Sequence, residues 1–322
     1  MKMNQSVGTR LIIVEGLTGS GKSIMAHFIA RQLEYNGIAA SWLHEGEFSH
    51  PILTDLDTSI ENYIAQVRAN WVAFVDQVGS STEVRVVEAC FFSNLLETLM
   101  AYNVAGSRIV QFAAELQAFS EPLNPTLVYL VQEDLEQALV RNFDNRGTGF
   151  RDFVIDLATS TPLAKDRGWE GYAGMLLYWQ EFVALTDELF EGFPYRKLKI
   201  DNTAGDWEAY NRQVTDLLSI SLISEQTISP TEASRLVGLY KDKHSGRNLT
   251  VRFEGGKLCI NLFLTVWTRL VRRAENEFLA EGWPFEINFE VDDSNRACLM
   301  KIGGRDIDYL ALVGTVAEKA PA

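Results

Sequence analysis

Eight consecutive residues near the start of the chain have the types and spacing that suit phosphate binding. The segment Gly16-Leu17-Thr18-Gly19-Ser20-Gly21-Lys22-Ser23 matches the pattern G-x-x-x-x-G-K-[ST] at every fixed position. Glycines allow backbone N–H groups to curve around a phosphate, and a helix that begins near Lys22 points its positive end at the same anion. We expect the Lys22 ammonium to bridge the β- and γ-phosphates of ATP or GTP, and the Ser23 hydroxyl to bind Mg²⁺. The predicted phosphate-binding residues are Gly16, Thr18, Gly19, Ser20, Gly21, Lys22 and Ser23.

A parallel sheet is the scaffold that would position this loop. Residues 11–14 form a continuous apolar run, which is typical of a strand buried on both faces. Further strands are predicted at residues 38–43, 84–87, 126–131 and 195–200. Helices are predicted at residues 22–36, 59–78, 91–103, 107–119, 170–191 and 206–222. Strands that alternate with helices predict an α/β fold of the P-loop NTPase type, with a five-stranded parallel sheet flanked by helices.

The helix predicted at residues 59–78 carries apolar residues at every third or fourth position, including Trp71 and Phe74. This stripe indicates a helical face that packs in the core. The alternative is that Trp71 or Tyr63 faces a substrate ring.

Residues 13–23 resemble the opening of the thymidylate kinase and deoxynucleoside kinase group. That group typically begins with an apolar strand, an acidic residue and then its P-loop, and Ile13-Val14-Glu15-Gly16 has this order. The resemblance covers roughly residues 8–222 and is most specific at the P-loop. It implies an ATP-dependent kinase that phosphorylates a small molecule.

The resemblance also implies two acidic site residues at strand ends. In that group a carboxylate just past the second strand acts as base or substrate ligand; here Glu45 is the first choice and Glu47 the second. Such a carboxylate can accept the proton of an attacking hydroxyl or hold Mg²⁺, and a solvated acidic loop is the alternative. Glu88 ends the third strand, where it could organise Mg²⁺ or substrate, or simply cap a helix. Ala89 replaces the Arg with which the group grips its acceptor, so the acceptor could also be another hydroxylated metabolite or an antibiotic.

Arginines after the fourth strand resemble the lid of these kinases. Arg141, Arg146 and Arg151 surround a segment that contains Gly147 and Gly149. A mobile loop there would bring guanidinium groups over the transferring phosphoryl group and exclude water, with Arg141 and Arg146 as the functional pair. A solvated basic loop is the alternative.

After the fifth predicted strand, Asn202 lies where the kinase group has its adenine-contacting loop. The resemblance therefore implies a contact between Asn202 and the nucleotide. The alternative is that Asn202 only forms a turn, as Asn often does.

The pattern changes after a polar linker at residues 225–232. Short strands are predicted at residues 249–253, 257–262, 285–291, 297–302 and 309–313, with a turn at 292–295. Short strands separated by turns indicate a small antiparallel β domain at residues 233–322. This domain follows a kinase-like domain at residues 1–224. Residues 238–240, 251–258 and 285–289 resemble the β-rich domain appended to some serine-hydrolase-like proteins. Such domains bind, cap or dimerise, which leaves a homodimer open.

The composition of the chain limits its partners. The 322 residues are 47% hydrophobic and carry a formal net charge of −14. Nucleic acids and anionic membranes are bound through clustered Lys and Arg, so we expect neither as the main partner. No run approaches the ~18 uncharged apolar residues of a membrane span. The polar start predicts no secretory signal, and three cysteines in apolar stretches are predicted to be buried thiols, so a cytoplasmic location is expected.

Two functions follow from these patterns. The P-loop, the two carboxylates and the arginines favour a kinase that transfers phosphate from ATP to a small-molecule acceptor. The alternative is a regulatory protein in which ATP occupancy controls how the β domain binds a partner. Acceptor-dependent release of ADP would distinguish the two.

Overall fold

The computed structural model describes residues 7–55, 59–263 and 266–320. Its internal contacts divide the chain into two compact units. One unit contains the described residues up to Glu45 and those of Ser49–Leu222; the other contains Gly46–Phe48 and the described residues from Ile223 onward. Residues 1–6, which belong to the polar start where we expect no secretory signal, lie outside the described residues.

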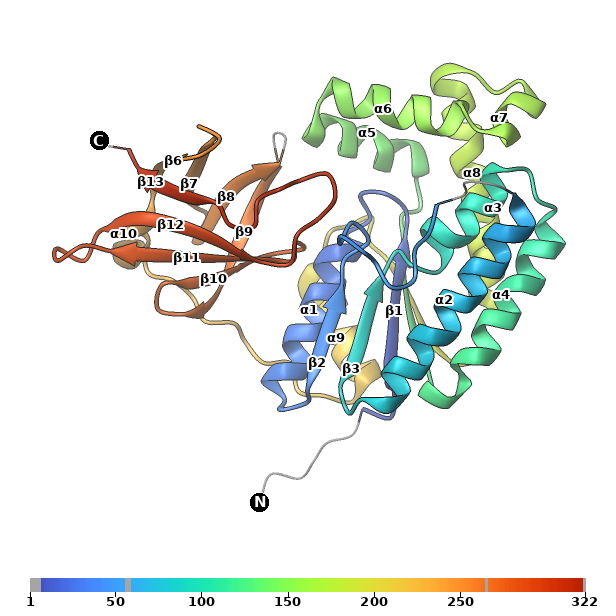
Figure 1. Cartoon of the computed structure of the whole chain (residues 1–322), viewed down its shortest axis with the longest axis horizontal. Coiled ribbons are helices and arrows are strands. Elements are labelled where there is room, and N and C mark those ends of the chain that lie inside the picture. The colour runs from blue at the N-terminus through green and yellow to red at the C-terminus, as the bar shows by residue number, and fades with distance from the viewer. Residues whose placement is uncertain (1–6, 56–58, 264–265, 321–322) are drawn as a thin grey trace. The chain divides into compact units, whose positions relative to one another are not determined.

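The first unit contains a five-stranded parallel sheet (Figure 1). Its strands are β1 (Leu11–Gly16), β2 (Ala40–Leu43), β3 (Val84–Glu88), β4 (Thr126–Val131) and β5 (Arg196–Asp201). Their order is β2-β3-β1-β4-β5. The central strand β1 sets the register, because Ile12 lies opposite both Val86 and Thr126. The predicted parallel α/β sheet is confirmed.

Helices connect the strands and cover both faces of this sheet. They are α1 (Lys22–Tyr35), α2 (Ile60–Ser80), the π-helical turn η1 (Phe92–Leu96), α3 (Glu97–Ala101), α4 (Gly106–Ser120), the 3₁₀ turn η2 (Glu121–Leu123), α5 (Leu135–Arg146), α6 (Thr148–Thr159), α7 (Pro162–Arg167), α8 (Gly171–Gly192) and α9 (Trp207–Leu218). Side chains alternate along β1: Ile12 and Val14 pack with α1 and α9, whereas Leu11 and Ile13 pack with α2, α4 and α8. Both faces of β1 are therefore buried, as its apolar run predicts.

The aromatic stripe of α2 belongs to the core. Trp71 is fully buried, and its indole N–H donates to the carbonyl oxygen of Leu116 at 3.0 Å and to Ser120 Oγ at 2.9 Å. Tyr63 is also buried and donates its hydroxyl to the carbonyl oxygen of Leu95 at 3.2 Å. The core interpretation of the stripe is confirmed.

The helix predicted at residues 91–103 is broken near its start. Ser93 and Asn94 have non-helical backbone angles, and Asn94 has a φ of 58° and a ψ of −59°. Regular α-helix begins only at Glu97. The break arises because the N–H groups of this segment bond to a side chain of β1, as described for the candidate site below.

The second unit is a closed antiparallel barrel with a short helix, α10 (Pro230–Leu236), before it. Its strands are β6 (Gly238–Asp242), β7 (Asn248–Glu254), β8 (Lys257–Phe263), β9 (Val266–Ala274), β10 (Glu277–Ala280), β11 (Phe285–Val291), β12 (Ala297–Gly304) and β13 (Val316–Lys319). Tyr240, Phe278 and Phe289 pack in its interior. The predicted antiparallel β domain is confirmed. α10 begins inside the stretch predicted to be a linker, with Ser229 and Glu232 forming a capping box.

Two predictions for this unit were wrong in detail. Residues 309–313 form turns instead of a strand, and the last strand is β13. The error has a simple origin, because Leu310 and Leu312 are buried while Tyr309 and Val313 are exposed, an alternation that imitates a strand. Of the thiols predicted to be buried, Cys259 is half-buried and Cys298 is exposed, since residues of β8 and β12 alternate between the inside and the outside of the barrel.

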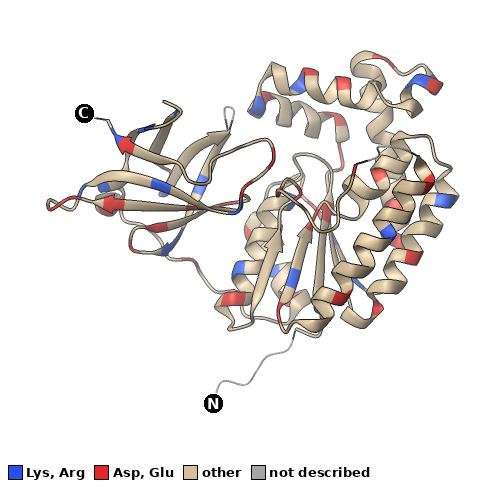
Figure 2. Cartoon of the chain, viewed as in Figure 1, with Lys and Arg blue, Asp and Glu red and all other residues tan. Residues whose placement is uncertain are grey.

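Charged side chains are distributed over both units, with acidic and basic residues interspersed (Figure 2). Within the part of the chain that the structure describes, no helix is long and apolar enough to cross a membrane.

Candidate active site

The predicted phosphate-binding loop joins the end of β1 to the start of α1. Gly16 has a φ of 149°, and a Cβ atom there would lie 2.4 Å from the carbonyl oxygen of Leu130 on β4. Gly21 has a φ of 92° and lies against the Trp207 ring of α9. A side chain at either position would force the loop away from its neighbours, so both glycines are required by geometry.

Lys22 and Ser23 are the first two residues of α1, at the positive end of the helix dipole. The Lys22 side chain is buried, and its Nζ donates to the carbonyl oxygen of Leu17 at 3.1 Å. The ammonium therefore lies over its own loop, where the phosphates of a nucleotide would bind.

Glu88 ends β3 and is completely buried. Its Oε1 lies 3.5 Å from Nε2 of His44 and accepts the backbone N–H of Glu45 at 3.4 Å. Burial, and then repulsion from Glu45, raise the pKa of Glu88 well above its usual range, although Lys22 and Ser23 counteract them. The other oxygen, Oε2, is buried and accepts no hydrogen bond from any described residue.

This orphaned oxygen fits a cation at the P-loop. Buried polar atoms without a partner are rare, and one on a carboxyl group that also interacts with Ser23 has the chemistry of a Mg²⁺ ligand. Among the described residues there is no group of three or more His, Cys, Asp or Glu side chains that could hold a metal. A P-loop Mg²⁺ needs no such group, because phosphate oxygens and water supply most of its ligands. Ser23 and Glu88 are thus the residues suited to hold it.

Glu45 follows β2 and accepts a hydrogen bond from Nδ2 of Asn94 at 3.0 Å. The same amide donates to the carbonyl oxygen of Ala89 at 2.7 Å, which holds Asn94 in its unusual backbone conformation. Glu47 has a different environment in the second unit, where its carboxylate accepts from Nε of Arg305 at 2.7 Å and from Nη2 at 3.0 Å. Of the two predicted carboxylates, Glu45 is therefore the one beside Glu88.

Glu97, the first residue of α3, is a further carboxylate that interacts with Glu45. It is half-buried and accepts the hydroxyl of Tyr178 from α8 at 3.0 Å. Burial raises the pKa of Glu97 to about 6; repulsion from Glu45 contributes in the same direction, and Lys22 opposes it.

Glu15 fixes the segment that carries Asn94 and Glu97. It is fully buried near the end of β1 and accepts backbone N–H groups from Phe91 at 2.7 Å, Phe92 at 3.0 Å and Ser93 at 3.2 Å. Because these N–H groups bond to a carboxylate, they leave the helical pattern, and this breaks the predicted helix. Burial raises the pKa of Glu15 to about 7 in spite of these bonds.

The predicted lid is a helical hairpin in the structure. Helices α5 and α6 lie beyond the carboxyl ends of the strands and meet at Gly147, which has a φ of 90° (Figure 1). The segment around Gly147 and Gly149 is therefore helical on both sides of Gly147 and not a loop, because Asp134 caps α5 and Gly147 allows α6 to begin immediately. Arg141 on α5 has a guanidinium N–H that is buried without a partner among the described residues, and Arg146 stacks on the Phe150 ring at 4.7 Å.

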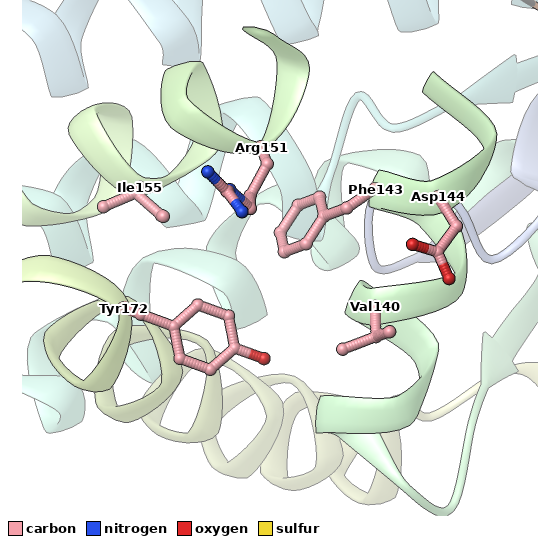
Figure 3. Close-up of a pocket in the computed structure, with 6 residues that line it drawn as sticks. All are labelled: Val140, Phe143, Asp144, Arg151, Ile155 and Tyr172. Atoms are coloured by element: carbon pink, nitrogen blue, oxygen red, sulfur yellow. The ribbon is translucent and has the colours of Figure 1, made fainter. Parts of the chain in front are cut away.

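Arg151 lines a pocket of about 450 Å³ between α5, α6 and α8 (Figure 3). The other lining residues are Val140, Phe143, Asp144, Ile155 and Tyr172. The opposite side of α5 contacts the P-loop, because Nδ2 of Asn142 lies 3.5 Å from the carbonyl oxygen of Thr18.

Asn202 contacts the P-loop backbone from the end of β5. Its Nδ2 donates to the carbonyl oxygen of Ser20 at 2.7 Å, and its Oδ1 is buried without a partner among the described residues. A turn is also present here, because Asp201 accepts the N–H and the hydroxyl of Thr203 as in an Asx turn. The turn alternative does not account for the contact between Asn202 and the P-loop.

Several residues of the candidate site were not predicted from the sequence. Glu97, Tyr178, Asn94 and Asn142 come from segments without a motif, and their meeting depends on helix packing. Glu15 was recognised as the acidic residue before the P-loop. The backbone N–H groups that it accepts lie 76 to 78 positions later in the chain, and spacing could not predict them.

No protein-family model and no curated protein matches the sequence. Among solved structures, the crystal structure of a thymidylate kinase from Ehrlichia chaffeensis is 13% identical to this chain, with a TM-score of 0.35; the match covers 66% of this chain and 100% of that one. A GTPase from Pyrococcus abyssi, in its apo form, is 16% identical with a TM-score of 0.26, and covers 65% of this chain and 98% of its own. These values are too low to transfer either activity.

The strand order and the loop are sufficient to assign the architecture. A parallel sheet in which β1 lies between β3 and β4 carries the glycine-rich loop at the carboxyl end of β1 and the start of α1. The first unit therefore has a fold of the P-loop NTPase type, followed in the chain by an antiparallel β-barrel.

Proposed function

We propose that this protein is a phosphotransferase that uses Mg·ATP, or Mg·GTP, to phosphorylate a hydroxyl or phosphate group of a small molecule. The observation that carries the proposal is the buried Glu88 carboxylate beside the P-loop. Its Oε2 lacks a partner among the described residues, and its Oε1 contacts the backbone of Glu45. A P-loop with two adjacent carboxylates has the parts that phosphoryl transfer needs.

Each residue has a defined task in this proposal. The backbone of residues 16–21 and the Lys22 ammonium would bind the phosphates. Ser23 and Glu88 would hold Mg²⁺, which would offset phosphate charge. Glu45 orients the acceptor hydroxyl and takes its proton as the oxygen attacks the γ-phosphorus. Arg141 and Arg146 stabilise charge on the transferring group, and the free guanidinium N–H of Arg141 supports this role.

The resemblance to the thymidylate kinase and deoxynucleoside kinase group makes nucleosides and nucleotides the first acceptors to test. Asn202 supports nucleotide binding indirectly, because its amide fixes the backbone at Ser20. Its unpartnered Oδ1 could accept a hydrogen bond from the base.

Two measurements test the proposal. Calorimetry should detect binding of Mg·ATP or Mg·GTP to the full chain, and Lys22→Ala should weaken it at least a hundredfold. ADP release with a panel of nucleosides, nucleotides and hydroxylated metabolites should depend on acceptor and vanish in Glu88→Ala. The absence of nucleotide binding would refute the proposal. Tight binding without turnover of any acceptor would favour the regulatory alternative instead.

A further inference from the structure

One polar side chain of helix α5 is buried against the P-loop. Asn142 is only 7% exposed, and the other buried side chains of this helix are the apolar Ala138, Leu139 and Phe143. Burial of an amide costs free energy unless its hydrogen bonds are satisfied, and an apolar side chain would fill the same space without that cost. The amide at this position therefore needs hydrogen-bond partners.

The Asn142 amide uses little of its hydrogen-bonding capacity. Its Nδ2 lies 3.5 Å from the carbonyl oxygen of Thr18, which is at the outer limit of a hydrogen bond, and its Oδ1 accepts none from the described residues. An amide can donate two hydrogen bonds and accept two. The contact with Thr18 identifies Nδ2 as the atom that faces the loop, since Oδ1 in its place would be repelled by the carbonyl oxygen. The second N–H of Nδ2 thus remains for a further partner.

Asn142 packs on the middle of the P-loop. A Cβ atom at Gly19 would lie 2.7 Å from both Cγ and Nδ2 of Asn142, and Gly19 has a φ of 84°. The amide occupies the space that a side chain at this position of the loop would take. Helix α5 therefore supplies a polar group that the loop itself lacks at Gly19.

Ser20, the next residue of the loop, indicates a polar ligand independently of Asn142. It is fully buried, and its Oγ has no hydrogen-bond partner among the described residues. Buried polar atoms without a partner are rare. Phosphate oxygens accept hydrogen bonds from both hydroxyl and amide groups, so a phosphate at this part of the loop would use both side chains.

We propose that Nδ2 of Asn142 donates a hydrogen bond to the terminal phosphate of the bound nucleoside triphosphate, and so contributes to the selection of a triphosphate over a diphosphate. This inference rests on the proposed function and adds a residue that selects its phosphate donor. The backbone of the loop and the start of α1 serve the inner phosphates. Arg141 directly precedes Asn142, so one turn of α5 would bring both side chains to the group that is transferred.

A neutral donor suits this position. The Lys22 ammonium is also buried at the loop and already supplies positive charge there. The Asn142 amide would add a directed hydrogen bond without further charge. A carboxylate of the same shape would instead place a negative charge against the phosphate, which makes Asn142→Asp the most informative variant.

The test compares nucleotides that differ by the terminal phosphate. Calorimetry on the full chain measures the dissociation constants of ADP and of the non-hydrolysable adenosine 5′-(β,γ-imido)triphosphate with Mg²⁺, and those of the corresponding guanine nucleotides. Asn142→Ala should weaken binding of the triphosphate analogue about tenfold, as expected for loss of one hydrogen bond to a charged group, and change that of the diphosphate less than about twofold. Asn142→Asp should weaken the analogue about a hundredfold or more, because repulsion adds to the lost bond.

A matched control removes an amide elsewhere on the same helix. Asn145 is exposed, and Asn145→Ala should change neither dissociation constant. Equal weakening of diphosphate and analogue in Asn142→Ala would mean that Asn142 only holds the loop in shape, and this result would overturn the inference. Binding of the analogue to Asn142→Asp as tightly as to the wild type would also overturn it. This second variant keeps the size of the side chain, so it decides the question even where Asn142→Ala does not fold.

The results distinguish this inference from the proposed function. If the Asn142 variants lose affinity for the triphosphate analogue alone but the wild type phosphorylates no acceptor, the inference stands and the phosphotransferase proposal fails. If the wild type phosphorylates an acceptor and Asn142→Ala binds both nucleotides as the wild type does, the proposal stands and the inference fails. A wild-type chain that binds neither nucleotide would contradict both.

Discussion

The carboxylate of Glu15 accepts the backbone N–H of Phe91 at 2.7 Å, which ties β1 to the segment after β3. Glu15 precedes the P-loop directly, and the segment that it holds leads to Asn94 and Glu97. A single buried side chain thus fixes the phosphate-binding loop and that segment relative to each other. Its pKa of about 7 makes this link sensitive to pH.

Glu15 should make the stability of the first unit fall as pH rises. The pKa of Glu15 is raised from 4.5 to about 7 in the folded protein, so its contribution is fully present below pH 4.5 and is lost as pH rises through 7. Between pH 5.5 and 8.5 the free energy of unfolding of the wild type should fall by about 2 kcal/mol relative to Glu15→Gln. Urea unfolding at several pH values measures this difference.

Glu61→Gln is the matched control for that experiment, because Glu61 is an exposed glutamate on α2. It should leave the pH dependence of unfolding as in the wild type. A Glu15→Gln profile that runs parallel to that of the wild type would contradict the prediction.

Replacing Glu88 should raise the stability of the protein and lower its activity. Glu88→Gln removes a buried charge that is repelled by Glu45, so the free energy of unfolding at pH 9 should rise by about 1 to 3 kcal/mol. Phosphotransfer should fall by roughly a hundredfold or more, because the Mg²⁺ ligand is lost. Glu83→Gln, one residue before the start of β3, should affect neither property. A Glu88→Gln enzyme that keeps its activity would remove Glu88 from the site.

The two glycines at the junction of α5 and α6 should respond differently to alanine. Gly147 has a φ of 90°, so Gly147→Ala should cost about 1 kcal/mol of unfolding free energy. Gly149 lies inside α6, and Gly149→Ala should stabilise the protein by about 0.5 kcal/mol. An added Cβ has open space at both positions, so only the backbone distinguishes them. Thermal unfolding of the two variants measures the difference, and equal effects would argue against the helical hairpin.

Asn202 should contribute to nucleotide affinity through the loop that it supports. Asn202→Ala removes the hydrogen bond to the carbonyl oxygen of Ser20, and we expect the dissociation constant of Mg·ATP to rise about tenfold. Calorimetry measures it, with Asn70→Ala on α2 as the control for loss of an amide elsewhere. An unchanged constant would mean that the loop keeps its shape without Asn202.

The parts that sequence reasoning predicted are those governed by local patterns. The P-loop, the strands of the sheet and most of its helices depend on periodicity and glycine positions, which neighbouring residues reveal. The break at Asn94 was missed because its cause, Glu15, lies in another strand. The strand predicted at residues 309–313 was wrong because burial alternated there without strand pairing. Glu97 and Tyr178 could not be paired in advance, since their contact depends on how α3 and α8 pack.

Closure of the barrel has a consequence for self-association. Each described strand of the barrel has a neighbour on both sides, so the described residues of this unit offer no strand edge for another chain to extend. The open edges of the described sheet are β2, which has four residues, and β5, which carries Lys197 and Lys199. Short strands and lysines both discourage edge-to-edge pairing. A homodimer would therefore be built from side-chain surfaces, and its formation would respond to surface substitutions more than to changes in strand register.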